Sequence, residues 1–284
     1  MSNQYHKTGV AKGASASFYA WQYLLFLAPL LILVALSLFT FENYQLGSEL
    51  TFEHYRGLLS NSTYFRALFN TLILAIGAGT LAVFLGYGFC LCVVFFLPKK
   101  MQWPVILAII APLLTNFVLK TFSWRLVLSD NGIVNAVLRN IGAEVDFLFH
   151  PLTVVFGVAM YALPFVIFIL YTTLSSIPRD LIYASENLGA TWGVTFKRVI
   201  IPLSLRGIFL SAVVVLIFAF SDFVTPTILG GSSLYTLSMY LTDTLRVSNI
   251  PQIAALGILT LLPALLVIAT LITVAETVFR KKMV

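Results

Sequence analysis

The 284-residue chain is 60% hydrophobic and only 10% charged, with a formal net charge of +6. Soluble domains carry about 25% charged residues, and single cores stop growing at about 250–300 residues, so this composition excludes an ordinary water-soluble globular protein. Because the cations are scattered among the segments between apolar runs, the positive charge favours a topological bias in a membrane protein over a nucleic-acid surface.

Six apolar stretches are long enough to cross a bilayer, whose core needs about 20 helical residues. No stretch alternates polar and apolar residues in the manner of a transmembrane β-barrel. Backbone groups in lipid must be satisfied within the segment, so we expect an all-α, polytopic membrane protein. We expect one transmembrane domain at 21–278, between tails at 1–20 and 279–284. The expected helices are Trp21–Phe41, Ala67–Leu97, Trp103–Phe122, Leu152–Leu174, Gly207–Phe223 and Ile253–Ala275.

The distribution of positive charge predicts the orientation of these six helices. With six helices, both termini lie on the same side of the membrane. Eleven of the 17 lysines and arginines fall on that side and six on the other. Because lysine and arginine accumulate in cytoplasmic loops, we expect both termini to be cytoplasmic, together with the segment between the fourth and fifth helices.

Four glycines in the second expected helix, Gly77, Gly79, Gly86 and Gly88, predict close packing against another helix. The partner helix belongs either to this chain or to a second subunit. The first expected helix has no clear small-x-small cleavage site, so we expect it to be retained rather than removed as a signal peptide.

Three features after the second helix leave alternatives open. Lys120 either snorkels to the outer interface, the favoured interpretation, or faces a water-filled path. The segment Asn131–Ile141 has apolar residues at helical spacing, which predicts a short helix outside the membrane. This helix either receives another protein or packs on the transmembrane core, and we favour packing. Tyr161 and Pro164 predict an interruption of the fourth helix, which lines a cavity or kinks a packed helix.

Common enzymatic motifs are absent from the sequence. There is no G-x-x-x-x-G-K-[ST] loop, no H-E-x-x-H and no G-x-S-x-G. His6, His54 and His150 fall in three separate polar segments, so we expect neither a nucleophile–base pair nor a metal site. Transport, a channel or a structural membrane role remain.

A polar segment, ASENLGATWGVTFKRVIIP (Ala184–Pro202), separates the fourth and fifth helices. We expect Asp180 to be the N-cap of a short helix that Gly189 ends in the left-handed conformation. A second helical piece follows from Ala190. Its apolar residues are expected to pack inward; they are Trp192, Val194, Phe196 and Val199. The small residues at the bend predict close approach of another protein, and a plain amphipathic connector is the alternative.

This segment resembles the cytoplasmic coupling loop of binding-protein-dependent ABC importer permeases. The family pattern is Glu-Ala-Ala, three residues, Gly, nine residues and Ile-x-Leu-Pro, and here Gly189 and Pro202 stand at the matching distance. Tyr183 replaces the family glutamate, which leaves Glu186 as the nearest acid. The resemblance implies a loop at 175–206 that docks on a separate ATPase. The implied docking residues are Tyr183, Ala184, Ser185, Glu186, Gly189, Ala190, Ile201 and Pro202.

Three further blocks, at 122–142, 160–178 and 221–231, are similar to those of the spermidine/putrescine-type permeases. The resemblance implies the type I ABC importer permease fold, a bacterial inner-membrane location and alternating access. It also implies a second related permease in a heterodimer, two ATPase subunits that use ATP and Mg, and an extracytoplasmic solute-binding protein. No cofactor of its own, no ATPase site and no nucleic acid are implied. A polyamine is the implied solute, and other small cationic or amino-acid-like solutes stay open.

Asp222 is a charged residue at the end of the fifth apolar stretch, where insertion costs about 2.5–3.5 kcal/mol. It either attracts a cationic solute, pairs with Lys120 or Arg125, or caps a following helix. Thr225-Pro226 and Gly230-Gly231 predict interruptions, and a constriction is expected from Phe223 to Gly231. The expected solute path is formed by Asp222, Phe223, Thr225, Tyr161, Trp124 and Lys120.

Two other functions are possible in principle. A secondary transporter driven by an ion gradient predicts several intramembrane acids and an internal repeat, whereas the sequence offers Asp222 alone and no convincing repeat. A membrane scaffold would not need a bent loop of small residues at this spacing. We therefore favour the importer permease.

Overall fold

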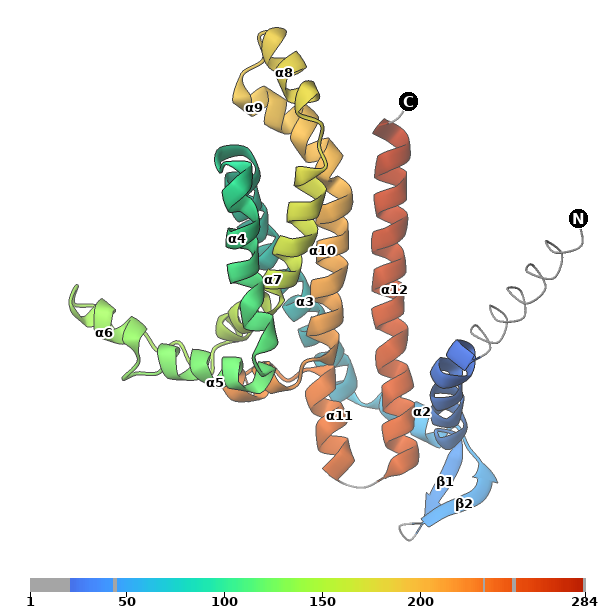
Figure 1. Ribbon diagram of the computed structural model, residues 1–284. Coiled ribbons are helices and arrows are strands. Elements are labelled where there is room, and N and C mark those ends of the chain that lie inside the picture. Colours follow the sequence, from blue (N-terminus) through green and yellow to red (C-terminus); the bar gives the residue numbers. More distant parts are fainter. Residues whose placement is uncertain (1–20, 43–44, 232, 247–248, 283–284) are drawn as a thin grey trace, which may run out of the picture. The chain divides into compact units, whose positions relative to one another are not determined.

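The structure, a computed structural model, describes residues 21–42, 45–231, 233–246 and 249–282 (Figure 1). The expected tail at 1–20 and the last two residues, 283–284, lie outside the described residues. The chain forms two compact units. The smaller comprises Met1–Ser62 with Asp243–Leu261, and the larger comprises Thr63–Thr242 with Leu262–Val284.

The described residues are helical apart from loops and one two-stranded sheet. The α-helices are α2 Glu53–Ser60, α3 Ser62–Leu91, α4 Lys99–Ile110, α5 Phe117–Leu128, α6 Ile133–Arg139, α7 Pro151–Ser175, α8 Arg179–Asn187, α9 Trp192–Thr195, α10 Ile201–Ser221, α11 Leu237–Arg246 and α12 Ile250–Lys282. Three π-helical turns, η1 Cys92–Phe96, η3 Phe196–Ile200 and η4 Pro226–Gly230, and one 3₁₀ turn, η2 Ala111–Leu114, join them.

The first expected helix is shorter than predicted. It covers Trp21–Leu36, and the chain then forms strand β1, Phe39–Glu42, which pairs antiparallel with β2, Gln45–Leu50. Threonine and phenylalanine favour strands, and the adjacent QLGSEL run supplies the partner. The prediction of helix through Phe41 is therefore wrong.

Four helices are long and apolar enough to cross a membrane: Ser62–Phe96, Pro151–Ser175, Trp192–Ser221 and Ile250–Thr277. They confirm the second, fourth, fifth and sixth expected helices and the all-α membrane fold. The count of six is approximate, because Trp21–Leu36 is short and the remaining span is broken.

The third expected helix, Trp103–Phe122, is wrong as a single rod. Lys99–Leu114 and Phe117–Arg139 meet at an angle of 100°. The break falls at Thr115 and Asn116, because Asn116 is extended and its side-chain oxygen accepts a hydrogen bond from the Val118 amide at 2.8 Å. An N-cap of this kind starts a new helix in a new direction.

Helix α7 packs along α10 and meets α3 at two glycines of α3. Glycines let the neighbouring helices approach it closely. A Cβ atom on Gly207 of α10 would lie 2.8 Å from Cβ of Thr173, and one on Gly86 of α3 would lie 2.9 Å from Cγ1 of Val166. Gly77 faces Val155 in the same way. The prediction of close packing is therefore confirmed within this chain for Gly77 and Gly86.

The other two glycines of α3 do not pack against a neighbouring helix. A Cβ atom added to Gly79 or Gly88 would meet nothing from another helix within 4 Å, and both glycines line an apolar cavity of about 760 Å³ between α3 and α10.

The predicted interruption of the fourth helix at Tyr161 and Pro164 is also wrong. Helix α7 continues through Pro164, a position that membrane helices tolerate because neighbouring helices restore the lost backbone contacts.

The glycine at the α7–α10 crossing gives a testable consequence. Gly207→Ala is expected to destabilise the protein by about 1–3 kcal/mol, because the added methyl group overpacks the contact with Thr173. The matched control is Gly79→Ala, which adds the same methyl group in open space and improves helix propensity by roughly 0.5–1 kcal/mol. Thermal unfolding of the purified transporter measures both. Equal melting temperatures for the two variants would contradict this account of the crossing.

Candidate functional site

Two candidate sites lie at opposite ends of the α7–α10 pair. At one end is the elbow, which we define as α8, the Gly189 bend and α9 (residues 179–195) (Figure 1). At the other end is Asp222, directly after α10. The 21 residues of α10 separate them by about 30 Å, close to the thickness of a bilayer core.

The elbow bends at a glycine in the left-handed conformation. Gly189 has φ +79°, and its amide donates to the Glu186 carbonyl at 2.8 Å. The Ala190 amide donates to the Ser185 carbonyl at 3.1 Å. This pair of hydrogen bonds is the Schellman motif, which ends a helix by satisfying its last carbonyls. The predicted stop at Gly189 is confirmed.

The tip of the elbow is exposed. Leu188 exposes 88% of its surface, and Tyr183, Ala184, Glu186 and Gly189 are exposed as well. Ser185 is half-buried because its hydroxyl bonds the Thr195 hydroxyl at 2.8 Å, which ties α8 to α9. The elbow therefore ends in a turn that is tied from within and exposes a large apolar side chain, Leu188.

Three contacts fasten the elbow to the end of α3. Arg179 donates to the Val94 carbonyl at 2.8 Å, within the π-helical turn η1. The indole of Trp192 lies edge-on to Phe95 and Phe96, with ring centroids 5.7 Å and 6.0 Å away. A small cavity of about 170 Å³ remains between these side chains and Tyr183. The elbow is therefore attached to the end of α3 as well as to α10.

Three expectations for this loop need correction. Asp180 is not the N-cap, because Pro178 holds that position and α8 begins at Arg179. Trp192 and Val194 are exposed, and Thr195 and Ile200 are the buried residues instead.

Ile201 and Pro202 lie apart from the tip, at the start of α10. Helix α9, η3 and α10 run on without a break from Trp192 to Ser221, so the second half of the elbow is the beginning of the span. Of the expected docking residues, the structure therefore gathers six at the elbow and leaves these two at its base.

At the other end, the Asp222 side chain caps a short helix. Its Oδ1 accepts hydrogen bonds from the Val224 amide at 2.8 Å and the Thr225 amide at 3.0 Å. The carbonyl of Asp222 accepts one from the Ser238 hydroxyl at 2.8 Å. Among the three interpretations of Asp222, helix capping is confirmed. The helix break falls at Asp222 and Phe223 rather than at Thr225-Pro226, because the cap starts a new turn there.

The second carboxylate oxygen of Asp222 is buried and unpartnered. The residue exposes 6% of its surface, and Oδ2 has no hydrogen-bond partner among the described residues. The Thr225 hydroxyl lies beside the carboxylate but outside hydrogen-bond geometry. No lysine or arginine in the described part of the chain forms an ion pair with Asp222, so the expected pairing with Lys120 or Arg125 is wrong. A buried acceptor without a donor is costly, so a donor from the Thr225 hydroxyl, from water or from a solute would stabilise this oxygen.

Aromatic rings surround the approach to Asp222. Tyr161 of α7 interacts electrostatically with Asp222. Its ring centroid lies 4.4 Å from that of Phe117 and 4.9 Å from that of Phe218. The Lys120 ammonium lies over the Tyr161 ring, 5.9 Å from its centroid, which is within cation–π range. This ring face therefore already accepts an alkylammonium group.

The structure brings together four of the six expected path residues: Asp222, Thr225, Tyr161 and Lys120. Trp124 contacts Phe156 edge-on at 4.9 Å, and Phe223 is exposed. Sequence reasoning missed Phe117 and Phe218. The sequence contained a signal for both, since each phenylalanine lies one helical turn before a charged residue, Lys120 or Asp222.

Among the described residues, no three His, Cys, Asp or Glu side chains are close enough to hold a metal ion.

Several membrane-crossing helices with an exposed, bent helical elbow at one end define an integral-membrane protein. The chain belongs to the family of binding-protein-dependent transport system inner membrane components, whose sequence profile matches residues 18–283. It is thus a multi-pass inner-membrane ABC importer permease. As a permease it is a non-enzymatic subunit, and ATPase activity is carried by partner subunits.

Two curated relatives are spermidine/putrescine transport system permease proteins PotB. The one from Haemophilus influenzae is 28% identical over 273 residues, which cover 94% of this chain and 93% of that protein. The one from Salmonella typhimurium is 28% identical over 216 residues, 75% of each chain. The fold is that of a bacterial alginate ABC transporter, crystallised with its alginate pentasaccharide-bound periplasmic protein. A chain of that complex matches with a TM-score of 0.78 at 19% identity, covering 98% of this chain and 97% of that one.

The left-handed bend of the elbow can be tested with two glycines of the same segment. Gly189→Ala forces an L-residue into φ +79°, at a cost of about 1–2 kcal/mol, and should unwind the end of α8. Gly193→Ala is the control, because it lies in helical α9 with no atom near the added methyl group. Hydrogen exchange of the α8 amides in the assembled transporter should speed up severalfold in the first variant only. Equal protection in both would refute the proposed role of Gly189.

Proposed function

We propose that this permease imports a polyamine of the spermidine or putrescine type. The observation that carries the proposal is the buried Oδ2 of Asp222, which has no hydrogen-bond partner among the described residues. An alkylammonium group of a solute would donate a hydrogen bond to this oxygen, and the aromatic face of Tyr161 would bind a second ammonium group. The similarity to the PotB proteins supports the same class of solute.

The flexible polymethylene chain of a polyamine matches the remaining surface. Phe117, Phe218 and Phe165 form a continuous aromatic cluster around Tyr161, with neighbouring centroids 4.4–5.1 Å apart. Aromatic side chains bind both methylene groups and ammonium groups, so successive amines could pass along them. In this structure the Lys120 ammonium lies over the Tyr161 ring, so a solute ammonium would have to displace it from that ring.

The elbow would couple this path to ATP hydrolysis. We propose that the termini and the elbow are cytoplasmic and that the elbow seats on one of two ATPase subunits, which bind ATP and Mg. A second, related permease would complete the membrane domain, and an extracytoplasmic binding protein would deliver the solute. Closure of the ATPases would push the elbow, and the unbroken α9–η3–α10 helix would carry that motion towards Asp222 in an alternating-access cycle.

Removing only the charge of Asp222 tests the solute. Asp222→Asn keeps Oδ1, and with it the bonds to the Val224 and Thr225 amides, but removes the negative charge. Charge-assisted hydrogen bonds contribute about 1.5–3 kcal/mol, so the KM for spermidine uptake should rise about tenfold or more. The measurement is uptake of labelled spermidine by proteoliposomes that contain the complete transporter.

The control for that measurement is Asp222→Ala, which removes both the charge and the cap. It should show the same rise in KM and, in addition, a loss of stability of about 1 kcal/mol. Unchanged uptake kinetics in Asp222→Asn would remove Asp222 from the solute path. Solute-stimulated ATP hydrolysis by a different small solute, with none by polyamines, would overturn the polyamine proposal.

The docking role of the elbow is tested at its most exposed residue. Leu188→Asp places a charge where an apolar tip would enter the ATPase, so co-purification of the ATPase subunits should be lost. Leu188→Met keeps an apolar side chain of similar size and should retain them. Membrane insertion should be normal in both. Full ATPase recovery with the aspartate variant would place the docking surface elsewhere.

A further inference from the structure

Helix α6 presents an apolar face that nothing in the described chain covers. Ile133 and Val137 lie four residues apart on one side, and Ile141 follows just after the helix. They expose 71%, 61% and 76% of their surface. The expectation that this segment packs on the core is therefore wrong for these side chains. The buried residue is Asn135, on the opposite side of the helix.

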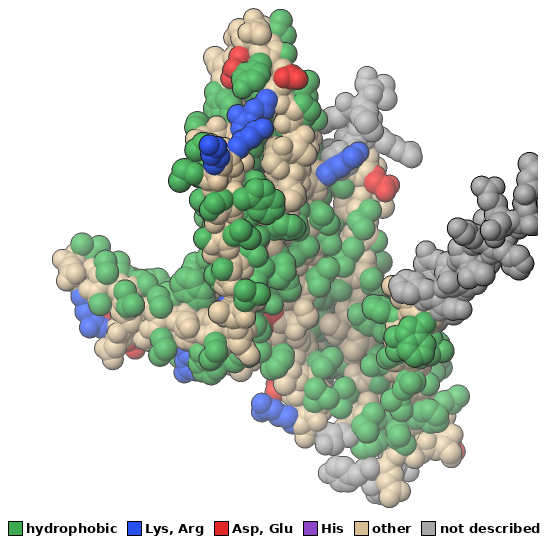
Figure 2. Space-filling model, in the orientation of Figure 1, with side chains coloured by type: hydrophobic (Ala, Val, Ile, Leu, Met, Phe, Trp, Pro, Cys, Tyr) green, Lys and Arg blue, Asp and Glu red, His purple; other side chains and the backbone are tan. Residues whose placement is uncertain are grey.

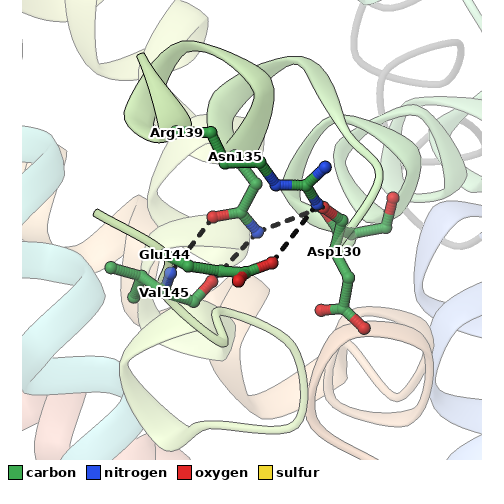
Figure 3. Close-up of polar contacts among 6 residues, drawn as sticks. Asp130, Asn135, Arg139, Glu144 and Val145 are labelled. Atoms are coloured by element: carbon green, nitrogen blue, oxygen red, sulfur yellow. Dashed lines mark hydrogen bonds and ion pairs between the residues drawn. The ribbon is translucent and has the colours of Figure 1, made fainter. Parts of the chain in front are cut away.

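A polar network holds that opposite side rigid (Figure 3). The Asn135 side chain donates to the carbonyls of Ser129 and Val145, at 3.3 Å and 3.0 Å, and accepts from the Val145 amide at 3.2 Å. Arg139 pairs with Glu144 at 3.3 Å and donates to the Asp130 carbonyl. The two ends of the loop are thus tied across α6. The apolar face is held in place before any partner arrives.

The bend after α4 sets the depth and direction of α6. Helix α4 with η2, Lys99–Leu114, has a rise of about 25 Å, slightly less than the bilayer core of about 30 Å. The following segment, Phe117–Arg139, turns by 100°. A segment at that angle to a membrane-crossing helix runs along the membrane plane. The segment then lies at the outer edge of the hydrocarbon core, at the end of the α4–η2 span that is remote from the elbow.

Charge is segregated across the same segment. Lys and Arg side chains lie along the lower edge of the arm formed by α5 and α6, and hydrophobic side chains gather above it, on the side of the elbow (Figure 2). Arg139, Glu144 and Asp130 all belong to the polar network, whereas Ile133 and Val137 lie opposite it. This arrangement is typical of helices that lie in a lipid interface with one apolar face buried among the acyl chains.

We propose that α6 lies in the outer lipid interface and that Ile133, Val137 and Ile141 are buried at the boundary of phospholipid headgroups and acyl chains. The exposed charges of the network, Arg139 and Glu144, face water. The preceding segment, α4 with η2, likewise exposes apolar side chains to lipid, at Trp103, Leu107 and Leu114. Because α5 carries Lys120 against Tyr161, the lipid contact holds one wall of the candidate solute path at constant depth. The surface is thus an anchor for lipid rather than a docking site for protein.

The proposal predicts which solvent reaches the α6 face. With Cys90→Ala and Cys92→Ala as background, a nitroxide at Val137→Cys is compared with one at Asp130→Cys, whose native carboxylate is exposed and points away from the network (Figure 3). The full transporter is assembled in phospholipid nanodiscs. The ratio of collisions with oxygen to collisions with a water-soluble nickel chelate should be severalfold higher at Val137. Addition of the solute-binding protein should leave it unchanged.

Three results would overturn the proposal. Equal nickel-chelate access at the two positions would place α6 in water. An immobile label at Val137 that neither reagent reaches would place α6 against the partner permease. Loss of oxygen access only when the binding protein is added would make the face its docking site. Recovery of the ATPase subunits with both labelled variants confirms that each has folded and assembled, independently of the solute.

Discussion

The close contacts of α7 with α3 and α10 are the constraint on which the rest of the structure depends. Lipid offers no hydrophobic drive for helices to associate, so membrane helices rely on small residues that let backbones approach. Gly86 against Val166 and Gly207 against Thr173 provide that approach here. They hold α10 beside a continuous α7, and this arrangement places the elbow at one end of the pair and Asp222 at the other.

Much of the fold could be predicted from the sequence, because transmembrane helices follow from apolar length alone. The elements that were predicted wrongly are those whose boundaries are set by local hydrogen bonds rather than by apolar length. Asn116 caps α5 and turns a predicted straight helix by 100°, and the FTFE segment leaves its helix because a strand partner follows. Pro164 failed to interrupt α7 for the opposite reason, since packing on both sides supports the helix.

The candidate sites were less predictable from the sequence. Gly189 was correctly assigned, because a left-handed helix stop has a strong local signal. The capping role of Asp222 was one of three open interpretations, and only the backbone geometry decides between a cap and an ion pair. The hydrogen bond from Arg179 to the Val94 carbonyl joins residues 85 positions apart, and no local sequence pattern predicts such a contact. The sequence also left Lys120 open between the lipid interface and the solute path, and its contact with Tyr161 depends on a ring that lies on another helix.

The π-helical turn η3 lies where α9 passes into α10. A π turn contains about one residue more than an α turn, and each residue of an α-helix corresponds to about 100° about the axis. If this turn tightened to α geometry, the surplus residue would pass along the helix and α10 would rotate about its own axis. A push delivered at the base of α10 could then arrive at its far end as a twist, which exchanges the side chains facing the interior without moving the helix sideways.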